Sequence, residues 1–259
     1  MQRKLGMYAE CLGKNTDGLE LIKSVGFQAV FTCFYKRKDI ETLRTKCDNL
    51  GLSFDFIHAP FENINSMWQD GDDLPIYNAL KESVLSASEF KVPIICIHVS
   101  SGWTPPPITD VGLKRFDELI DLAAKNGVIV AVENQRLLDR VDFFMKRYAK
   151  STNVQFCYDC GHEHCFTENV EFLKLFGDRL VCTHIHDNTG KPESGDNDAH
   201  LLPFDGNIDY KAMMKDLDAC GYKGSLMLEV SKRRYGDAFT DEEFLIQAFD
   251  RIKKISLLK

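Results

Sequence analysis

The chain has 259 residues, of which 44% are apolar, so it can bury a full hydrophobic core as one domain or two. Its formal net charge of −7 and its isoelectric point near 5.5 provide no basic surface for a nucleic acid or an anionic membrane. No apolar run reaches the roughly 18 residues of a membrane span, and the opening MQRKLGMYAE lacks the apolar core of a signal peptide. Nine cysteines, several of them inside apolar runs typical of buried reduced thiols, indicate a cytoplasmic protein.

Strand and helix patterns alternate along the whole chain. Strands are predicted at residues 5–11, 29–34, 52–58, 92–99, 128–133, 154–159, 180–186 and 225–230, and helices at 17–25, 39–50, 73–90, 110–126, 141–149, 169–176, 210–220 and 241–255. The near-continuous apolar run at 92–99 indicates burial on both faces, as in a parallel sheet. Alternation without repeat or linker predicts a single-domain (β/α)8 TIM barrel over residues 1–259. An open doubly wound sheet is the alternative, but no glycine-rich phosphate loop follows the first strand.

Side chains of the metal-binding types stand at the ends of six successive predicted strands. They are His58, His98, Glu133, Asp159, His184 and Glu229, and no histidine of the chain falls in a predicted helix. In a barrel, the carboxyl ends of the strands converge on one mouth, where active sites are built. Any one of these residues is readily explained as a satisfied polar group, but six in succession predict a metal site at this mouth.

The stretch 181–210 adds further ligand types. It begins as a strand in which His184 and His186 share one face, and it continues as a polar loop that contains Asp198 and His200. Asp209 is expected to cap the helix that follows. A polar surface loop is the alternative interpretation, but imidazoles and carboxylates delivered by a strand into a loop also suit a divalent cation.

The order Glu133, Asp159-x-x-His162, His184, Glu229 resembles the xylose-isomerase-like TIM barrels, which include sugar-phosphate isomerases and epimerases. The resemblance covers nearly the whole chain. It implies one divalent ion (Zn, Mn, Mg or Co) held by the residues that match Glu133, Asp159, His184 and Glu229, with His162 contacting the substrate. The family's GxGxIDW-type loop ending is altered here, because Phe204 stands at the first glycine and Tyr210 replaces tryptophan.

The endonuclease IV-type branch of the same superfamily implies a larger centre. Its three-zinc site uses residues similar to His58, His98, Glu133, Asp159, His162, His184, Asp198, His200 and Glu229, all present in order. The resemblance therefore implies two or three ions. It does not imply a DNA substrate, because an acidic chain with short loops offers few phosphate contacts or inserted side chains.

These residue types predict a metal-dependent isomerase or epimerase. An ion bound by carboxylates and an imidazole leaves positions for two substrate oxygens and acidifies the neighbouring C–H bond. Glu133 and Glu229, on opposite sides of a sugar, sugar phosphate or polyol ketone, would exchange its proton through an enediolate, with His162 assisting. The alternative is a multinuclear-zinc phosphoester hydrolase. A non-catalytic metal-binding module is weaker, because so many titratable groups at one mouth are costly to keep without use.

Several other residues are weaker candidates for substrate contacts. The predicted contacts are Trp103, Glu62, Asn134, His186 and Lys191, the last of these with a phosphate. Trp103 can equally cover the barrel rim, Arg136 is expected to be a solvated loop residue, and His164, which has no strand-end position, is expected to be a satisfied polar group. Cys157-x-x-Cys160 lacks a second CxxC and is not predicted to be a redox pair. The expected partner is a small sugar, and a homo-oligomer is compatible with the sequence.

Overall fold

A computed structural model of the protein describes residues 3–13, 17–71, 74–191 and 197–259. Eight parallel strands form its sheet in the order β7-β6-β5-β4-β3-β2-β1-β8. The strands are β1 (Leu5–Tyr8), β2 (Ala29–Thr32), β3 (Ser53–His58), β4 (Ile94–Ile97), β5 (Ile129–Glu133), β6 (Val154–Asp159), β7 (Leu180–His184) and β8 (Leu226–Leu228). Just beyond β7, the Ile185 amide donates to the Met227 carbonyl at 2.8 Å, and the Glu229 amide donates to the Ile185 carbonyl at 3.0 Å. These two bonds join β7 to β8, so the predicted TIM barrel is confirmed.

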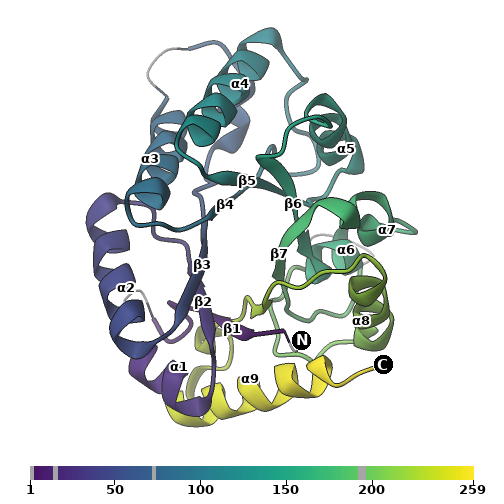
Figure 1. Ribbon diagram of the computed structural model, residues 1–259. Helices are drawn as coiled ribbons and strands as arrows, with labels where there is room; N and C mark the ends of the chain where they lie inside the picture. Colours follow the sequence, from purple (N-terminus) through teal and green to yellow (C-terminus); the bar gives the residue numbers. More distant parts are fainter. Residues whose placement is uncertain (1–2, 14–16, 72–73, 192–196) are drawn as a thin grey trace.

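Helices surround the ring of strands (Figure 1). They are α1 (Leu19–Val25), α2 (Arg37–Leu50), α3 (Pro75–Glu89), α4 (Asp110–Lys125), α5 (Leu138–Arg147), α6 (Cys160–Phe166), α7 (Phe172–Phe176), α8 (Tyr210–Ala219) and α9 (Asp241–Ser256). Short 3-10 turns lie at Ile64–Trp68, Gly177–Arg179, Lys232–Arg234 and Gly236–Ala238. In the described part of the chain, no helix has the length and apolar character needed to cross a membrane.

One helix of the structure was not predicted, and two predicted helices begin at other residues. Helix α6 was not expected; it begins at Cys160, where the Asp159 carboxylate accepts the His162 amide at 2.7 Å and caps the helix. His162 and His164, which no predicted helix contained, therefore lie in a helix. The helix predicted at 169–176 begins only at Phe172, and the one predicted at 141–149 begins at Leu138. The predicted start of the third helix, Asp73, lies outside the described residues.

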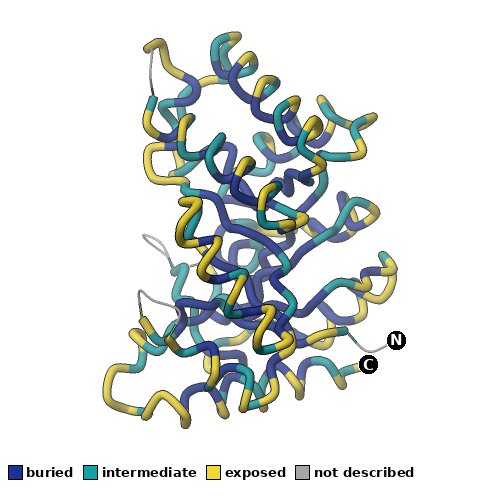
Figure 2. Tube along the Cα trace, turned by 60° about the vertical axis from the view of Figure 1, so that its left-hand side comes forward, coloured by how far each residue is buried: buried dark blue, intermediate teal, exposed yellow. Residues whose placement is uncertain are grey.

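The interior of the barrel is filled by a layer of small and aromatic side chains. This layer consists of Ala29, Phe31, Phe56, Cys96, Ala131, Cys157, Cys182 and Met227. Because side chains alternate along a strand, the residue two positions further on also points into the barrel, and it lies nearer the carboxyl end of the strand. Cys96 is followed in this manner by His98, and Cys182 by His184. Figure 2 shows the buried strands within helices whose outer faces are exposed. The packed layer is thus the floor of the mouth.

Candidate metal centre

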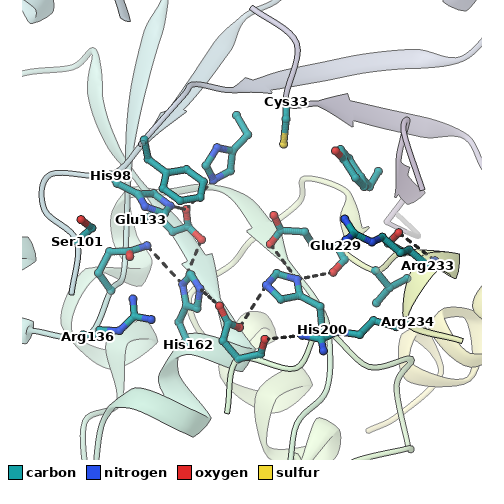
Figure 3. Close-up of a pocket in the computed structure, with 17 residues that line it drawn as sticks. Cys33, His98, Ser101, Glu133, Arg136, His162, His200, Glu229, Arg233 and Arg234 are labelled. Atoms are coloured by element: carbon teal, nitrogen blue, oxygen red, sulfur yellow. Dashed lines mark hydrogen bonds and ion pairs between the residues drawn. The ribbon is translucent and has the colours of Figure 1, made fainter. Parts of the chain in front are cut away.

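A cavity of about 820 Å³ opens at the mouth of the barrel, above this floor. It is lined by Tyr8, Cys33, His58, Phe61, His98, Ser101, Glu133, Gln135, Arg136, His162, Asp198, His200, Glu229, Val230, Ser231, Arg233 and Arg234. Figure 3 shows Glu133, His162, His200 and Glu229 between two walls that carry arginines. The strand-end residues predicted from the sequence therefore do converge on one site.

Glu133, at the end of β5, lies at the centre of this site and is fully buried. One carboxylate oxygen, Oε2, lies 3.2 Å from His58 Nε2 and 2.9 Å from His98 Nε2. The other, Oε1, lies 3.0 Å from His184 Nδ1 and 3.3 Å from His162 Nδ1. Burial by itself would raise the pKa of Glu133, but His184, His98 and His162 hold it well below its usual range. Glu133 is therefore a carboxylate shared among four imidazoles.

Asp159 and Glu229 complete a compact group around His184. His184 Nδ1 lies 3.8 Å from Asp159 Oδ2 and 3.6 Å from Glu229 Oε2. Burial lowers the pKa of His184, but the carboxylates of Glu229 and Glu133 outweigh it and raise the value to about 10. One ligand atom from each of Glu133, Asp159, His184 and Glu229 lies within 4.8 Å of the others. This is the group that the resemblance implied for a single ion.

A second group lies nearer to solvent, where α6 faces the loop after β7. Asp198 Oδ2 is 3.3 Å from His162 Nε2, and Asp198 Oδ1 is 3.2 Å from His200 Nε2. The ring of His186 stacks on that of His200, with centroids 3.9 Å apart. Burial would raise the pKa of Asp198, but His162 and His200 hold it far below its usual range. Ligand atoms of His162, His186, Asp198 and His200 all lie within 4.8 Å of one another.

The loop that carries Asp198 and His200 is tied down by Asp187. The buried Asp187 carboxylate accepts the backbone amides of Asn188, Phe204 and Ile208 at 2.9, 2.8 and 3.2 Å. Phe204, at the position of the family's first glycine, has a φ of 73°. A left-handed φ favours glycine and is strained for a bulky residue, so Phe204 holds a backbone conformation that glycine would adopt more easily. Gly206 packs so closely on Asn188 and Asp187 that a Cβ there would overlap them.

The donor set fits divalent cations. Three groups of ligand atoms gather within 4.8 Å: the two above, and a third made of His58, Cys96, Glu133 and His184. His98, the ninth predicted ligand, is outside these groups but contacts Glu133. Among the described residues, buried His98 Nδ1, His184 Nε2 and His186 Nδ1 have no hydrogen-bond partner. These are the nitrogens on the other side of each ring; the nitrogens that face the carboxylates, together with the carboxylate oxygens, are the donor set expected around a divalent cation.

The five predicted substrate contacts lie outside the cavity lining. Trp103 is 43% exposed and its ring meets that of Phe166 edge-on at 5.8 Å. Glu62 is exposed, and Lys191 pairs with Glu168 at 3.0 Å. Trp103, Glu62 and Lys191 therefore do not line the cavity in which a substrate would bind, and their predicted contacts stay predictions.

Asn134 and His186 are buried below the cavity surface. Both ends of the Asn134 amide bond the backbone of Asp159, each at 2.7 Å, so this side chain holds β5 to β6 beneath the site. His186 lies 3.1 Å from Asp159 Oδ1 and joins the outer ligand group. His164, at the far end of α6, contacts Asn207 Oδ1 at 2.6 Å.

Several lining residues were missed at the sequence level. Tyr8 ends β1, Cys33 follows β2, and Ser231, Arg233 and Arg234 follow β8. The strand-end rule that selected the histidines applies equally to them. The sequence-level prediction covered side chains of metal-ligand types rather than every side chain beyond a strand end.

Known proteins are similar to this chain in sequence or in fold. Protein y4fM of Sinorhizobium fredii (strain NBRC 101917 / NGR234) is 36% identical over 129 residues, which span 47% of this chain and 40% of y4fM. The chain thus spans less than half the length of that relative. A crystal structure of the IolI protein with a bound zinc atom has a TM-score of 0.76 at 17% identity, with 98% of both chains covered. The 3-keto-D-glucoside 4-epimerase YcjR from E. coli has a TM-score of 0.71 at 16% identity, covering 98% of this chain and 99% of its own.

These structural similarities show a common fold. The sequence itself carries the family assignment, because the family model described as xylose isomerase-like TIM barrel matches residues 19–255. The chain belongs to the xylose isomerase-like TIM barrel family.

Proposed function

We propose that this protein is a divalent-metal-dependent isomerase or epimerase of a sugar, a sugar phosphate or a related polyol ketone. The observation that carries the proposal is the group of Glu133, Asp159, His184 and Glu229 at the base of a cavity large enough for a sugar. The 4-epimerase activity in the printed name of YcjR and the zinc atom in the IolI structure support it.

The first ion would be held by these four residues. When bound, a divalent cation polarises a substrate carbonyl and acidifies the neighbouring C–H bond. The three carboxylates and one imidazole in the group suit a hard or borderline ion. Their side chains come from β5, β6, β7 and the end of β8, so rigid strands fix their positions.

The two glutamates differ in their surroundings. The Glu133 side chain is 1% exposed and is contacted by four imidazoles, whereas the Glu229 side chain is 16% exposed and faces the cavity. The imidazole nitrogens nearest to Glu229 belong to His184 and His200, at 3.6 and 3.8 Å. A carboxylate crowded by donors is a poor proton acceptor, so we assign the removal of the substrate proton to Glu229. Proton return by Glu133 from the opposite side stays a prediction; its proton would have to come from an imidazole in contact with the carboxylate, such as His162.

His162 has a role that depends on the outer group. Its side chain is 7% exposed, lines the cavity and contacts both Glu133 and Asp198. With only the inner ion bound, its imidazole can donate a hydrogen bond to a substrate oxygen. When Asp198 and His200 also hold an ion, His162 Nε2, which lies 3.3 Å from Asp198 Oδ2, would be a ligand of that ion.

The cavity rim favours a substrate with a negatively charged group. Arg136 lies on one wall and Arg233 and Arg234 on the other (Figure 3). Arg234 donates to the Asp198 carbonyl at 3.1 Å, and Arg136 lies 4.0 Å from the centre of the Phe166 ring. Arg233 is exposed, and no carboxylate of the described residues is within ion-pair distance of its guanidinium. A guanidinium is well shaped to bind a phosphate in a bidentate manner, which favours a sugar phosphate.

The test is the exchange of a substrate C–H proton with solvent. Metal-loaded protein is incubated in deuterated water with a panel of ketoses and ketose phosphates, and label is detected by NMR. We expect label next to the carbonyl of at least one compound, and a loss of exchange rate of at least about 10²-fold in Glu229→Gln. The control variant Glu242→Gln, on the exposed start of α9, keeps the full rate.

A phosphoester hydrolase is the second candidate, because all nine residues similar to the three-zinc site lie at this mouth. Clustered ions would activate water and stabilise a leaving oxygen. Absence of label with every ketose, together with metal-dependent cleavage of a simple phosphodiester or abasic DNA, would replace the isomerase proposal by this one.

A further inference from the structure

Three cysteines lie directly beneath the metal centre, in the layer that forms the floor of the mouth. Cys96, Cys157 and Cys182 come from β4, β6 and β7, and their exposures are 0%, 0% and 3%. Each precedes a residue of the site by two positions: His98, Asp159 and His184. Apolar side chains would fill this layer equally well. What distinguishes the three thiols is the position of each sulfur atom relative to the ligands above it.

Cys96 is the thiol that reaches the ligand layer. Its Sγ lies 3.5 Å from Glu133 Oε2, the same oxygen that lies 3.2 Å from His58 Nε2 and 2.9 Å from His98 Nε2. One ligand atom from each of His58, Cys96, Glu133 and His184 is within 4.8 Å of the others, and all four residues are buried. Sulfur, nitrogen and oxygen ligands thus surround one point between the floor and the cavity.

We propose that Cys96 is a thiolate ligand of a metal ion that is also held by His58, Glu133 and His184. The inference rests on the metal centre of the proposed function but not on its reaction. On binding, the Cys96 S–H bond breaks, its electron pair enters the new metal–sulfur bond, and the proton is released to solvent. The ion would lie beside the one held by Asp159 and Glu229, and Glu133 could offer one oxygen to each. A neutral imidazole binds one ion, so with both positions filled His184 would serve this ion, and the other would be held by Glu133, Asp159 and Glu229.

A sulfur ligand determines which ion this position accepts. Thiolates favour zinc and cobalt and disfavour magnesium and calcium, which prefer oxygen ligands. Two imidazoles, one carboxylate and one thiolate also complete a four-coordinate shell from the protein alone, which is typical of a structural zinc site. This ion would then hold Glu133 in place, and the catalytic ion would be the one beside Glu229.

Cys157 provides a matched control for Cys96. It lies in the same layer with the same exposure, and its Sγ is 3.9 Å from His184 Nδ1. Nevertheless, Cys157 is absent from the three groups of ligand atoms. A general effect of replacing a buried thiol in the floor would appear in both variants, whereas the loss of a specific ligand would appear in Cys96→Ser alone.

The experiment uses cobalt(II), which gives a near-ultraviolet charge-transfer absorption when a thiolate is bound to it. Wild-type protein and the variants Cys96→Ser and Cys157→Ser are loaded with cobalt(II), and bound cobalt per chain is measured by elemental analysis. We expect the thiolate absorption in wild type and in Cys157→Ser, and its loss in Cys96→Ser. The affinity for zinc at this position should fall by about tenfold or more in Cys96→Ser. Cys96→Ala repeats the measurement if the serine variant does not fold.

Three results would overturn the inference: no cobalt bound by wild type, bound cobalt without the thiolate absorption, or an absorption unchanged by the loss of Cys96. An absorption lost in Cys157→Ser and kept in Cys96→Ser would show that Cys157 is the ligand and Cys96 is not. A protein that shows the absorption but exchanges no substrate proton leaves the Cys96 ligand intact and removes only the proposed reaction.

Discussion

Arg233 is the residue of the cavity wall best placed to select a substrate that carries a negatively charged group. Its guanidinium lies in the lining without a carboxylate partner among the described residues, while the loop beneath it is fixed. The Lys232 amide donates to the Cys11 carbonyl at 2.9 Å, and the Arg233 amide donates to Ser231 Oγ at 3.3 Å. A fixed backbone with an available guanidinium is the arrangement expected of an anion-binding residue.

Replacing this residue should separate charged substrates from neutral ones. We expect Arg233→Gln to weaken binding of a ketose phosphate by roughly tenfold to a hundredfold, the effect of a lost hydrogen bond to a charged group. Binding of the same ketose without phosphate should not change. Steady-state kinetics with the matched pair measures this, and Arg147→Gln, which breaks an outer ion pair with Asp117, is the control. Equal weakening of both ketoses would contradict the assignment.

Glu10 is a buried carboxyl group beside the cavity that the proposed reaction does not use. It is 5% exposed, accepts the Thr32 hydroxyl, and accepts the Cys33 amide at 3.3 Å. Burial raises its pKa from 4.5 to about 7, more than these hydrogen bonds lower it. The folded protein therefore holds a proton on Glu10 between these two pH values, where the unfolded chain releases it.

The stability of the protein should consequently depend on pH through Glu10. The contribution is fully present below pH 4.5 and is lost as the pH rises to about 7, a difference of about 3 kcal/mol. Glu10→Gln should remove this slope and be more stable than wild type at pH 8. Urea unfolding at pH 5 and pH 8 measures the effect, with Glu20→Gln on α1 as the exposed control. If Glu10→Gln keeps the wild-type slope, another group is responsible.

Among the elements, the strands were predictable and the segments that follow them were less so. Alternating and continuous apolar patterns located all eight strands, and with them His58, His98, Glu133, Asp159, His184 and Glu229. Helix α6 was missed because its seven residues, CGHEHCF, carry no amphipathic pattern, and its capping residue Asp159 was assigned only to the strand. Short helices stabilised by tertiary packing leave little signal in a local pattern.

Contacts across the barrel could not be predicted from the sequence. The role of Asn134 in joining β5 to β6 and the position of His186 within the outer ligand group depend on which side chains meet across strands. The approach of Cys96 to Glu133 is of the same kind. The sequence indicates the direction of a side chain along its own strand, whereas these distances depend on strand register and on packing in the barrel.

The loop after β7 should respond to substitution of Gly206. A methyl group there would overlap the Asn188 carbonyl and the Asp187 carboxylate, the residues that hold the loop. We expect Gly206→Ala to lower the free energy of unfolding by about 2 kcal/mol, a typical cost of overpacking. It should also weaken zinc binding by Asp198 and His200.

Thermal unfolding and zinc titration of Gly206→Ala measure these effects. Gly13→Ala is the matched control, because a Cβ at Gly13 meets no atom within 4 Å. Unchanged zinc affinity in Gly206→Ala would show that the outer ligands do not depend on this loop anchor.

For the whole molecule, barrel closure is what turns residues distant in sequence into one site. His58 on β3 and Glu229 after β8 are separated by most of the chain, yet both line the same cavity. The floor of packed side chains closes this cavity from below, and the cavity opens at the mouth of the barrel. We propose that the residues gathered there bind divalent metal ions.

The most direct test of that claim is the number of divalent ions bound per chain in purified, zinc-replete protein, measured by elemental analysis for wild type and Asp159→Ala. Asp159 belongs to the inner group and caps α6, so circular dichroism checks that the variant remains folded. We predict at least one ion per chain in wild type, more than one when zinc is plentiful, and loss of the inner ion in Asp159→Ala. A wild-type protein without bound metal, or full occupancy in a folded Asp159→Ala variant, would contradict the account.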